Sequence, residues 1–244
     1  MSNFANIVEV FSSIQGEAKY VGCRQIFVRF SGCNLTCKYC DTKISHNHQS
    51  QCEIEKIPGK RNFIKVNNPI YAEDLVNTIN KLLVLPHHSV SFTGGEPLCR
   101  ADFIHHIAKE IDCKLYLETN GTLYAELQKV IDDIDIVSMD IKLPSATGSV
   151  LWKEHYEFLK IANQKEVFVK LVVSGETTND EFLEAITLVA DVDRTIPFII
   201  QPVTPINGCK AVSPNAVLKY QENALKKLSD VRVIPQTHKF INQM

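Results

Sequence analysis

The chain has 244 residues, of which 45% are hydrophobic and 22% are charged, and its formal net charge at pH 7 is −2. Such a length suits one large α/β domain or two small ones, and the composition is that of an ordinary globular protein. A net charge this close to zero gives no general nucleic-acid- or membrane-binding surface. No apolar stretch reaches membrane-spanning length. Residues 1–6 carry no positive segment followed by an apolar run, so we expect no signal peptide and a cytoplasmic protein.

The first predicted elements set a pattern that continues to the end of the chain, in which short apolar runs alternate with amphipathic stretches. This alternation is typical of βα units around a parallel sheet. We expect strands at Ile26–Phe30, Ser89–Phe92, Lys114–Glu118, Ile134–Met139, Val167–Val173, Phe198–Gln201 and Val231–Ile234. We expect helices at Ala72–Leu83, Asp102–Ile111, Leu123–Ile131, Trp152–Ala162, Asn179–Ala190 and Asn215–Leu228. Right-handed crossovers between parallel neighbours would curl this array into a partial (β/α) barrel of about six parallel strands.

Residues 43–68 interrupt the alternation. The segment is polar overall, but it contains two alternating apolar runs, Cys52–Ile57 and Asn62–Val66, on either side of Pro58-Gly59-Lys60-Arg61. This pattern predicts a small β-hairpin. We therefore interpret residues 1–244 as a single domain in which 43–68 is an insertion, and we expect this insertion to act as a lid or as a partner contact.

Polar residues follow several of the predicted strands. In barrels of this kind the loops after the carboxyl ends of the strands carry the function, because they meet on one face. Five loops should converge there: Ser31–Thr42, Thr93–Pro97, Thr119–Thr122, Asp140–Pro144 and Pro202–Asn207.

The first of these loops contains three closely spaced cysteines, Cys33, Cys37 and Cys40, among eight in the chain. Reduced thiols are expected in a protein without a signal peptide, and the five scattered cysteines are best read as buried structural residues. An iron–sulfur cubane needs one thiolate at each of its four iron corners, so three thiolates in one loop would leave one iron open to another ligand. The alternative is a structural zinc site that takes its fourth ligand from His46, His48 or Cys52.

Three cysteines with this spacing, after the first strand and with the aromatic Tyr39 before the third, resemble the radical S-adenosylmethionine (SAM) enzymes. The resemblance implies a [4Fe–4S] cluster on Cys33, Cys37 and Cys40, whose open iron binds SAM. It also implies that an electron donor such as flavodoxin or ferredoxin reduces the cluster, which then cleaves SAM to methionine and a 5′-deoxyadenosyl radical.

The loop Thr93-Gly94-Gly95-Glu96-Pro97 supports this resemblance. Paired glycines let a backbone approach a ligand closely, and Glu96 can accept hydrogen bonds from an ammonium group. The loop resembles the motif with which this superfamily binds the methionine part of SAM. The cofactor-binding residues expected in this way are Tyr39, Cys40, Asp41, Gly94, Gly95, Glu96, Asp140, Lys142, Lys170 and Gln201. For the last four, ordinary solvation at strand ends is an equal alternative.

A third group of residues points to one family within the superfamily. The Gln15-Gly16-Glu17 turn precedes the first strand, Arg29 lies inside an otherwise apolar strand, Thr42 follows the third cysteine, and the chain ends with Pro235–Phe240 and a short tail. A buried arginine is costly unless it meets an anion. Together these features resemble the 7-carboxy-7-deazaguanine synthases, from about residue 8 to the C-terminus. A salt bridge would also account for Arg29, and a core position for His238.

This second resemblance implies a lyase that converts 6-carboxy-5,6,7,8-tetrahydropterin to 7-carboxy-7-deazaguanine with loss of ammonia, in deazapurine (queuosine-type) biosynthesis. Thr42 would help to bind Mg²⁺, and the enzyme would be a homodimer that binds neither nucleic acid nor membrane. The substrate-binding residues implied are Ile14, Gln15, Gly16, Glu17, Arg29, Thr93, Glu118, His238 and Met244.

One departure favours an alternative function. The Asp140-Ile141-Lys142 sequence differs from the Ser-Pro-Lys of the synthases and resembles the Asp-Leu-Lys of enzymes that install glycyl radicals. A glycyl-radical-enzyme activating enzyme is therefore the second hypothesis, although it leaves the Gln15-Gly16-Glu17 turn unexplained.

Overall fold

A computed structural model of the chain describes residues 3–243, and a ten-stranded sheet lies at its centre. The strand order is β12-β11-β10-β9-β8-β7-β3-β2-β4-β5. These strands span β2 Ile7–Ile14, β3 Arg24–Phe30, β4 Gln51–Glu55, β5 Phe63–Asn67, β7 Ser89–Gly94, β8 Leu115–Thr119, β9 Ile136–Ile141, β10 Glu166–Val173, β11 Phe198–Pro202 and β12 Val231–Val233. A separate antiparallel pair joins β1 Phe4–Ala5 to β6 Ile70–Tyr71.

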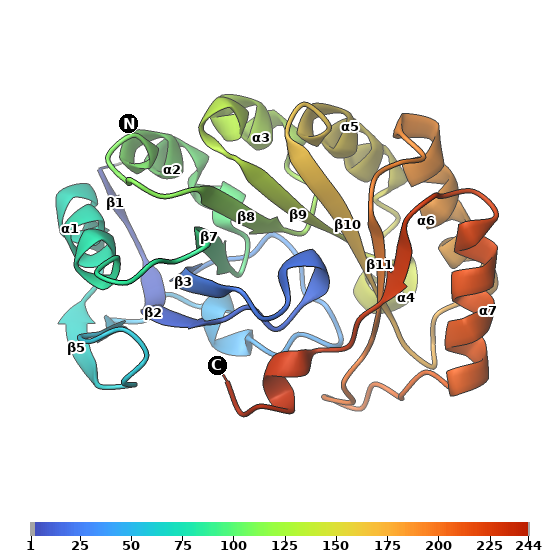
Figure 1. Cartoon of the computed structure of the whole chain (residues 1–244), viewed down its shortest axis with the longest axis horizontal. Coiled ribbons are helices and arrows are strands. Elements are labelled where there is room, and N and C mark those ends of the chain that lie inside the picture. The colour runs from blue at the N-terminus through green and yellow to red at the C-terminus, as the bar shows by residue number, and fades with distance from the viewer. Residues whose placement is uncertain (1–2, 244) are drawn as a thin grey trace.

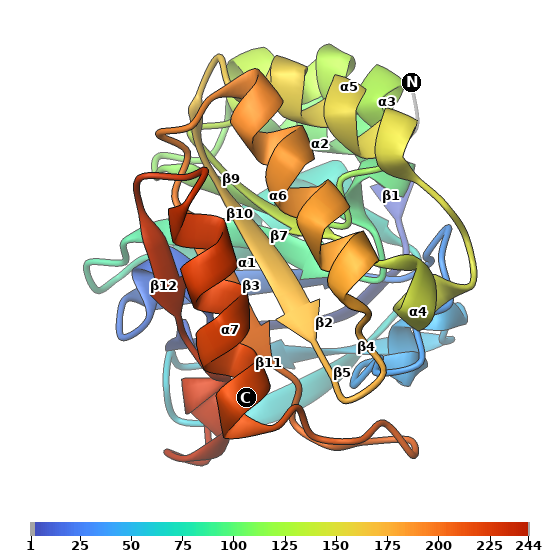
Figure 2. The same ribbon diagram turned by 90° about the vertical axis from the view of Figure 1, so that its right-hand side faces the viewer.

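Helices cover the outer face of the curved sheet, as Figures 1 and 2 show. They are α1 Ala72–Leu82, α2 Ala101–Ala108, α3 Tyr124–Val130, α4 Pro144–Thr147, α5 Trp152–Ala162, α6 Asn179–Val192 and α7 Pro214–Leu225. Short 3₁₀ turns occur at Ala18–Tyr20, Lys43–His46, Pro97–Arg100, Ile131–Asp133 and Thr237–Lys239. Over residues 3–243, no helix has the length and apolar character needed to cross a membrane.

The predicted parallel half of the sheet is confirmed. From β3 to β12 each neighbouring pair of strands is parallel, and the expected strands and helices are present with ends shifted by a few residues. The sheet ends at β12 on one side and β5 on the other, so it is an open, partial barrel.

The other half of the sheet contains a strand that the pattern did not predict. Strand β2 pairs antiparallel with β3 and leads directly into the Gln15-Gly16-Glu17 turn. Most of its residues are buried, on both faces, so it lacks the polar alternation by which a half-exposed strand is found. Strand β4 runs parallel to β2 and pairs antiparallel with β5, which makes residues 51–67 a hairpin at the edge of the sheet.

Two hydrophobic layers decide where the fold can hold a ligand. The larger one lies between the sheet and its helices. The smaller one fills the inside of the barrel near the amino ends of the strands and consists of Ala18, Tyr116, Ile136, Phe168 and Ile199, with Tyr20 and Ile234 packed against it. Since the amino-terminal end is filled, the interior can open only at the carboxyl ends.

Candidate functional site

A cavity opens at the carboxyl ends of the parallel strands, where the five loops were expected to converge. The four predicted metal-binding residues line it: Cys33, Cys37, Cys40 and Thr42. So do most of the predicted cofactor-binding residues, namely Tyr39, Cys40, Asp41, Gly94, Gly95, Asp140, Lys142, Lys170 and Gln201. The predicted substrate-binding residues that line it are Ile14, Gln15, Gly16, Glu17, Arg29, Thr93, Glu118 and His238. Glu96 lies behind the wall, and Met244 falls outside the described residues.

The cysteine loop is held by hydrogen bonds from two neighbouring strand-end loops. The side chain of Asn34 accepts a hydrogen bond of 2.8 Å from the side-chain amide of Asn120 and donates one of 2.9 Å to the Thr122 hydroxyl. From the loop after β11, the Asn207 amide donates to the Cys40 carbonyl at 2.9 Å. The three thiols are therefore fixed at the rim of the cavity.

The thiols fit a cluster better than a single zinc ion. In the described part of the chain, no three His, Cys, Asp or Glu side chains gather closely enough to hold one metal ion. Cys40 Sγ lies 3.4 Å from His46 Nε2, and Cys52 is buried in β4. A cubane instead takes one thiolate at each corner, so its ligands need not converge on one point. Burial raises the pKa of the Cys33 and Cys37 thiols. A bound metal ion would offset this rise, because it favours the thiolate form of its ligands.

The paired glycines after β7 are required by backbone packing. A Cβ at Gly94, whose φ is +133°, would lie 2.3 Å from the carbonyl oxygen of Phe30, and a Cβ at Gly95 would lie 2.0 Å from that of Gly32. No larger residue fits at either position. The glycines were expected to let a ligand approach, and they also let the β7 loop pack directly against the start of the cysteine loop.

Glu96 joins two strand-end loops. Its buried carboxylate accepts hydrogen bonds from the backbone amides of Leu98 at 3.1 Å and Asn120 at 2.8 Å, and from the Thr119 hydroxyl at 2.8 Å. Burial outweighs these bonds and raises the pKa of Glu96 to about 7. A role for Glu96 toward SAM stays a prediction: its carboxylate already accepts three hydrogen bonds, and about one of its four acceptor positions is left for a ligand.

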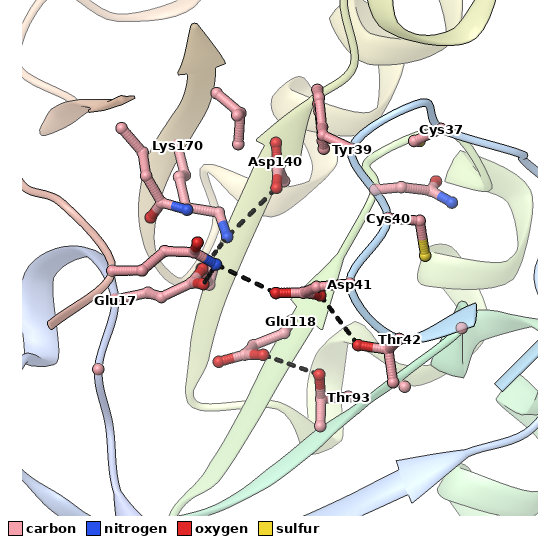
Figure 3. A pocket seen from close by; sticks show the side chains of 18 of the residues that line it. Glu17, Cys37, Tyr39, Cys40, Asp41, Thr42, Thr93, Glu118, Asp140 and Lys170 are labelled. Atoms are coloured by element: carbon pink, nitrogen blue, oxygen red, sulfur yellow. Dashed lines mark hydrogen bonds and ion pairs between the residues drawn. The ribbon is translucent and has the colours of Figure 1, made fainter. Parts of the chain in front are cut away.

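A network of alternating charges crosses the cavity floor (Figure 3). The ammonium of Lys170 contacts Glu17 and lies 3.2 Å from Asp140, whose carboxylate is 2.8 Å from the ammonium of Lys142. Burial opposes the charge of both lysines, but the carboxylates prevail and raise the pKa of each. Burial likewise opposes the charge of Glu17, and the bonds to Lys170 and Gln236 lower its pKa to about 2.

Three buried polar atoms on the cavity wall have no hydrogen-bond partner within residues 3–243. They are Tyr39 Oη, Asp140 Oδ1 and Gln201 Oε1. Buried polar atoms in folded proteins are normally satisfied, so unsatisfied ones around a cavity fit a polar ligand. The two oxygens of Asp140 and Gln201 can accept bonds from the hydroxyl or amino groups of a nucleoside.

A second set of polar side chains lies on the opposite wall. Glu118 accepts hydrogen bonds from Gln15 Nε2 at 2.6 Å and from the Thr93 hydroxyl at 2.8 Å. The side-chain oxygen Oε1 of Gln15 in turn accepts from the backbone amide of Glu17 at 3.0 Å. These three side chains come from the turn after β2, from β7 and from β8, and the geometry gives the wall both donors and acceptors.

Arg29 makes the salt bridge that was the alternative to a ligand contact. Its Nε lies 2.7 Å from Glu9 on the paired strand β2. Its two terminal nitrogens have no hydrogen-bond partner among the described residues, and the side chain lines the cavity. Arg29 can therefore hold Glu9 and still offer donors to an anion.

The C-terminal segment completes the wall. Gln236 donates to Glu17 Oε1 at 2.7 Å and to Asp41 Oδ2 at 3.2 Å, and Lys239 lies 3.5 Å from Asp41. Gln236 and Lys239 both line the cavity, although only His238 of the Pro235–Phe240 motif was predicted to do so. Their position within that short motif was the signal that could have found them.

Replacing Gly95 with alanine tests the packing of the two loops. In Gly95→Ala the new methyl group would meet the Gly32 carbonyl, so we expect a loss of about 1–3 kcal/mol in the free energy of unfolding and reduced iron content after reconstitution. Chemical denaturation and iron analysis measure these. Gln164→Ala is the control, because this side chain is exposed and makes no hydrogen bond among residues 3–243. Normal iron content in Gly95→Ala would contradict this packing role.

The low pKa of Glu17 makes a prediction about acid stability. Because folding lowers this pKa from 4.5 to about 2, the ionised group stabilises the fold above pH 4.5, and this contribution is lost as the pH falls toward 2. We expect Glu17→Gln to be less stable than the wild-type apoprotein near pH 6, with the difference shrinking between pH 4.5 and 2. Urea denaturation across this range is the measurement, and a difference independent of pH would refute the assignment.

Comparisons with known proteins agree with this geometry. The Radical SAM superfamily matches residues 27–200. A 7-carboxy-7-deazaguanine synthase of Geobacter sulfurreducens is 44% identical over 98% of both chains, and one of Archaeoglobus fulgidus is 36% identical over 97% of this chain and 98% of the relative. The crystal structure of QueE from Escherichia coli shares the fold, with a TM-score of 0.62, 21% identity and coverage of 96% of this chain and 95% of that one. The chain therefore belongs to the radical SAM superfamily and, within it, to the 7-carboxy-7-deazaguanine synthase family.

Proposed function

We propose that this chain converts 6-carboxy-5,6,7,8-tetrahydropterin to 7-carboxy-7-deazaguanine with loss of ammonia, in deazapurine (queuosine-type) biosynthesis. The observation that carries the proposal is the cavity itself, which has three thiols on one rim and the Gln15–Glu118–Thr93 group on the opposite wall. The name of the relatives that match nearly the whole chain supports it. The alternative of a glycyl-radical activating enzyme has no comparable support.

Membership of the superfamily implies a [4Fe–4S] cluster and SAM as cofactors. We assign the cluster to Cys33, Cys37 and Cys40. Together, the bound cluster and SAM supply one-electron chemistry that removes a hydrogen atom from a carbon of the substrate. The protein has to place that carbon correctly and keep water out, and the low exposure of Asp140 (8%) and Gln201 (2%) suits this task.

The residues between the thiols and the opposite wall are assigned to SAM. The unpartnered oxygens of Asp140 and Gln201 would accept from its adenosyl part, and the ammonium of Lys142 would hold Asp140 in place. The cofactor contacts proposed with them are Tyr39, Cys40, Asp41, Gly94, Gly95, Glu96 and Lys170.

The opposite wall is assigned to the pterin. A pterin edge presents a guanine-like row of donors and acceptors, which a carboxylate, an amide and a hydroxyl can match. Glu118, Gln15 and Thr93 provide these groups, and the free guanidinium nitrogens of Arg29 would bind the substrate carboxylate. Ile14, Gly16, Glu17, His238 and Met244 complete the proposed contacts.

The overall reaction needs no net oxidant or reductant. The atoms of the carboxytetrahydropterin equal those of the deazaguanine acid plus ammonia, so the hydrogen atom removed at the start has to be returned. The radical-bearing substrate must therefore remain enclosed while its ring contracts. Walls formed by five strand-end loops and the C-terminal segment provide such an enclosure.

We further propose that Thr42 helps to bind Mg²⁺. Its hydroxyl donates to Asp41 at 3.0 Å at the cavity rim, near the thiols. Mg²⁺ prefers oxygen ligands and keeps several waters, so one hydroxyl together with a substrate carboxylate is a sufficient anchor.

An electron donor such as flavodoxin or ferredoxin and a homodimeric assembly complete the proposal. Support for the donor comes from a surface hollow beside the cluster loop, lined by Cys37, Lys38, Lys43 and Glu176. Lys38 pairs with Glu176 at 3.2 Å, so Lys43 is the basic side chain that the hollow offers to an acidic partner near a cluster thiol. The dimer and the cytoplasmic location stay predictions of the sequence.

The proposal predicts product formation in a defined mixture. Protein reconstituted with iron and sulfide without oxygen, then mixed with dithionite, SAM, Mg²⁺ and carboxytetrahydropterin, should release the deazaguanine acid and ammonia. Cys37→Ala should lose both the brown colour of the cluster and the product. Cys23→Ala, which alters a cysteine outside the loop, should keep both. A brown wild-type protein that cleaves SAM but leaves the pterin unchanged would refute the proposed substrate.

Substituting Thr42 tests the proposed Mg²⁺ site. We expect Thr42→Ala to require about tenfold more Mg²⁺ for half-maximal activity, since one oxygen ligand of the ion is lost. Thr42→Ser keeps the hydroxyl and should behave like the wild type. Activity measured over a Mg²⁺ titration gives the answer, and identical Mg²⁺ dependence in all three proteins would exclude Thr42 as a ligand.

A further inference from the structure

The hairpin β4–β5 contacts the C-terminal segment, and the proposed function makes no use of this contact. Arg61 in the hairpin turn donates from Nη2 to the carbonyl oxygen of Asn242 at 2.6 Å and to Gln243 Oε1 at 3.2 Å. These residues are far apart in sequence, and Figure 1 shows the red C-terminal segment running toward the cyan hairpin.

The buried carboxylate of Glu55 holds the backbone of Arg61 in place. The φ of Arg61 is +54°, and its backbone amide donates to Glu55 Oε1 at 2.7 Å. Glu55 is only 2% exposed, and its other oxygen accepts from the Ser12 amide at 2.9 Å. Because Ser12 belongs to β2, the hairpin turn is anchored to the strand that leads into Gln15 on the pterin side.

The C-terminal segment depends on polar contacts of this kind. Thr237 donates from both its amide and its hydroxyl to the Gly16 carbonyl, at 2.7 and 3.0 Å, and the Gln243 amide donates to the His238 carbonyl at 2.9 Å. Phe240 is 78% exposed and Ile241 is 49% exposed, so apolar burial contributes little to holding them.

His238 makes the position of this segment matter for the cavity. The ring packs so tightly on Gly16 that a Cβ there would lie 2.3–2.6 Å from three His238 atoms. The Gln243 amide closes the segment back onto the His238 carbonyl. A change at the Arg61 end can therefore be transmitted to the cavity wall through residues 238–243.

We propose that Arg61 is a positioning residue: the hairpin holds the C-terminal segment 237–243 and so keeps His238 in the wall on the pterin side. This assigns a role to the insertion, which acts as a support for the chain terminus. The inference rests on the proposed function only for the identity of the molecule that the wall binds.

The test uses Arg61→Ala, Arg61→Lys and the control Lys60→Ala in the full chain with its cluster. Lys60 lies in the same turn and is exposed, and its backbone amide, which the substitution keeps, bonds to Ile57. Hydrogen–deuterium exchange of peptides covering 237–243 should be about tenfold faster in Arg61→Ala than in the wild type and unchanged in Lys60→Ala. Arg61→Lys, which retains one charged donor, should give an intermediate rate.

Kinetics then separate positioning from a general loss of structure. We expect Arg61→Ala to raise KM for the carboxytetrahydropterin by about tenfold and to leave SAM cleavage without pterin unchanged, with partial recovery in Arg61→Lys. Unchanged exchange in Arg61→Ala overturns the proposal, and so does faster exchange with an unaltered KM. If the wild type does not consume the pterin, the proposed function fails, while the exchange rates still decide whether Arg61 holds the segment.

Discussion

The ammonium of Lys170 inside the barrel is the constraint on which the arrangement of the cavity depends. A buried, unpaired ammonium would cost several kcal/mol, so carboxylates have to reach it. Asp140 does so from the neighbouring strand β9, and Glu17 does so from a turn 153 residues earlier in the chain. The ion pair therefore docks the N-terminal turn into the barrel, which brings Gln15 beside Glu118 and gives the C-terminal segment, through Gln236, a carboxylate to bind.

The two sides of the cavity are built by different means. Backbone groups and glycines dominate the thiol side, where the loops after β3 and β7 touch without intervening side chains. The opposite side, which we propose binds the pterin, consists of side chains from several strands and turns, linked by hydrogen bonds and ion pairs. This division suits a superfamily that keeps one cofactor and changes its substrates, because side chains can be exchanged without altering the backbone of the cofactor side.

The sequence was most informative where a regular pattern decides the structure. Parallel strands with polar carboxyl ends predicted one convergent face, and the three cysteines, the glycine pair and the Gln15-Gly16-Glu17 turn do lie on one cavity. It was least informative where distant side chains meet. Nothing in the pattern indicated that Glu17 pairs with Lys170 or that Arg61 reaches Asn242, because such contacts depend on how strands far apart in the chain are placed in space. Strand β2 escaped detection since burial on both faces removes the alternation.

The contact between Arg61 and the C-terminal segment has a practical consequence for anyone who prepares this protein. A purification tag fused to the C-terminus would follow closely on Asn242 and Gln243, which Arg61 binds, and a few residues after His238 and Lys239 of the cavity wall. The bulk of the tag would compete with the hairpin for the position of this segment. The N-terminal strand β1 pairs with β6 and contributes no residue to the cavity. An affinity tag or a fluorescent fusion therefore belongs at the N-terminal end.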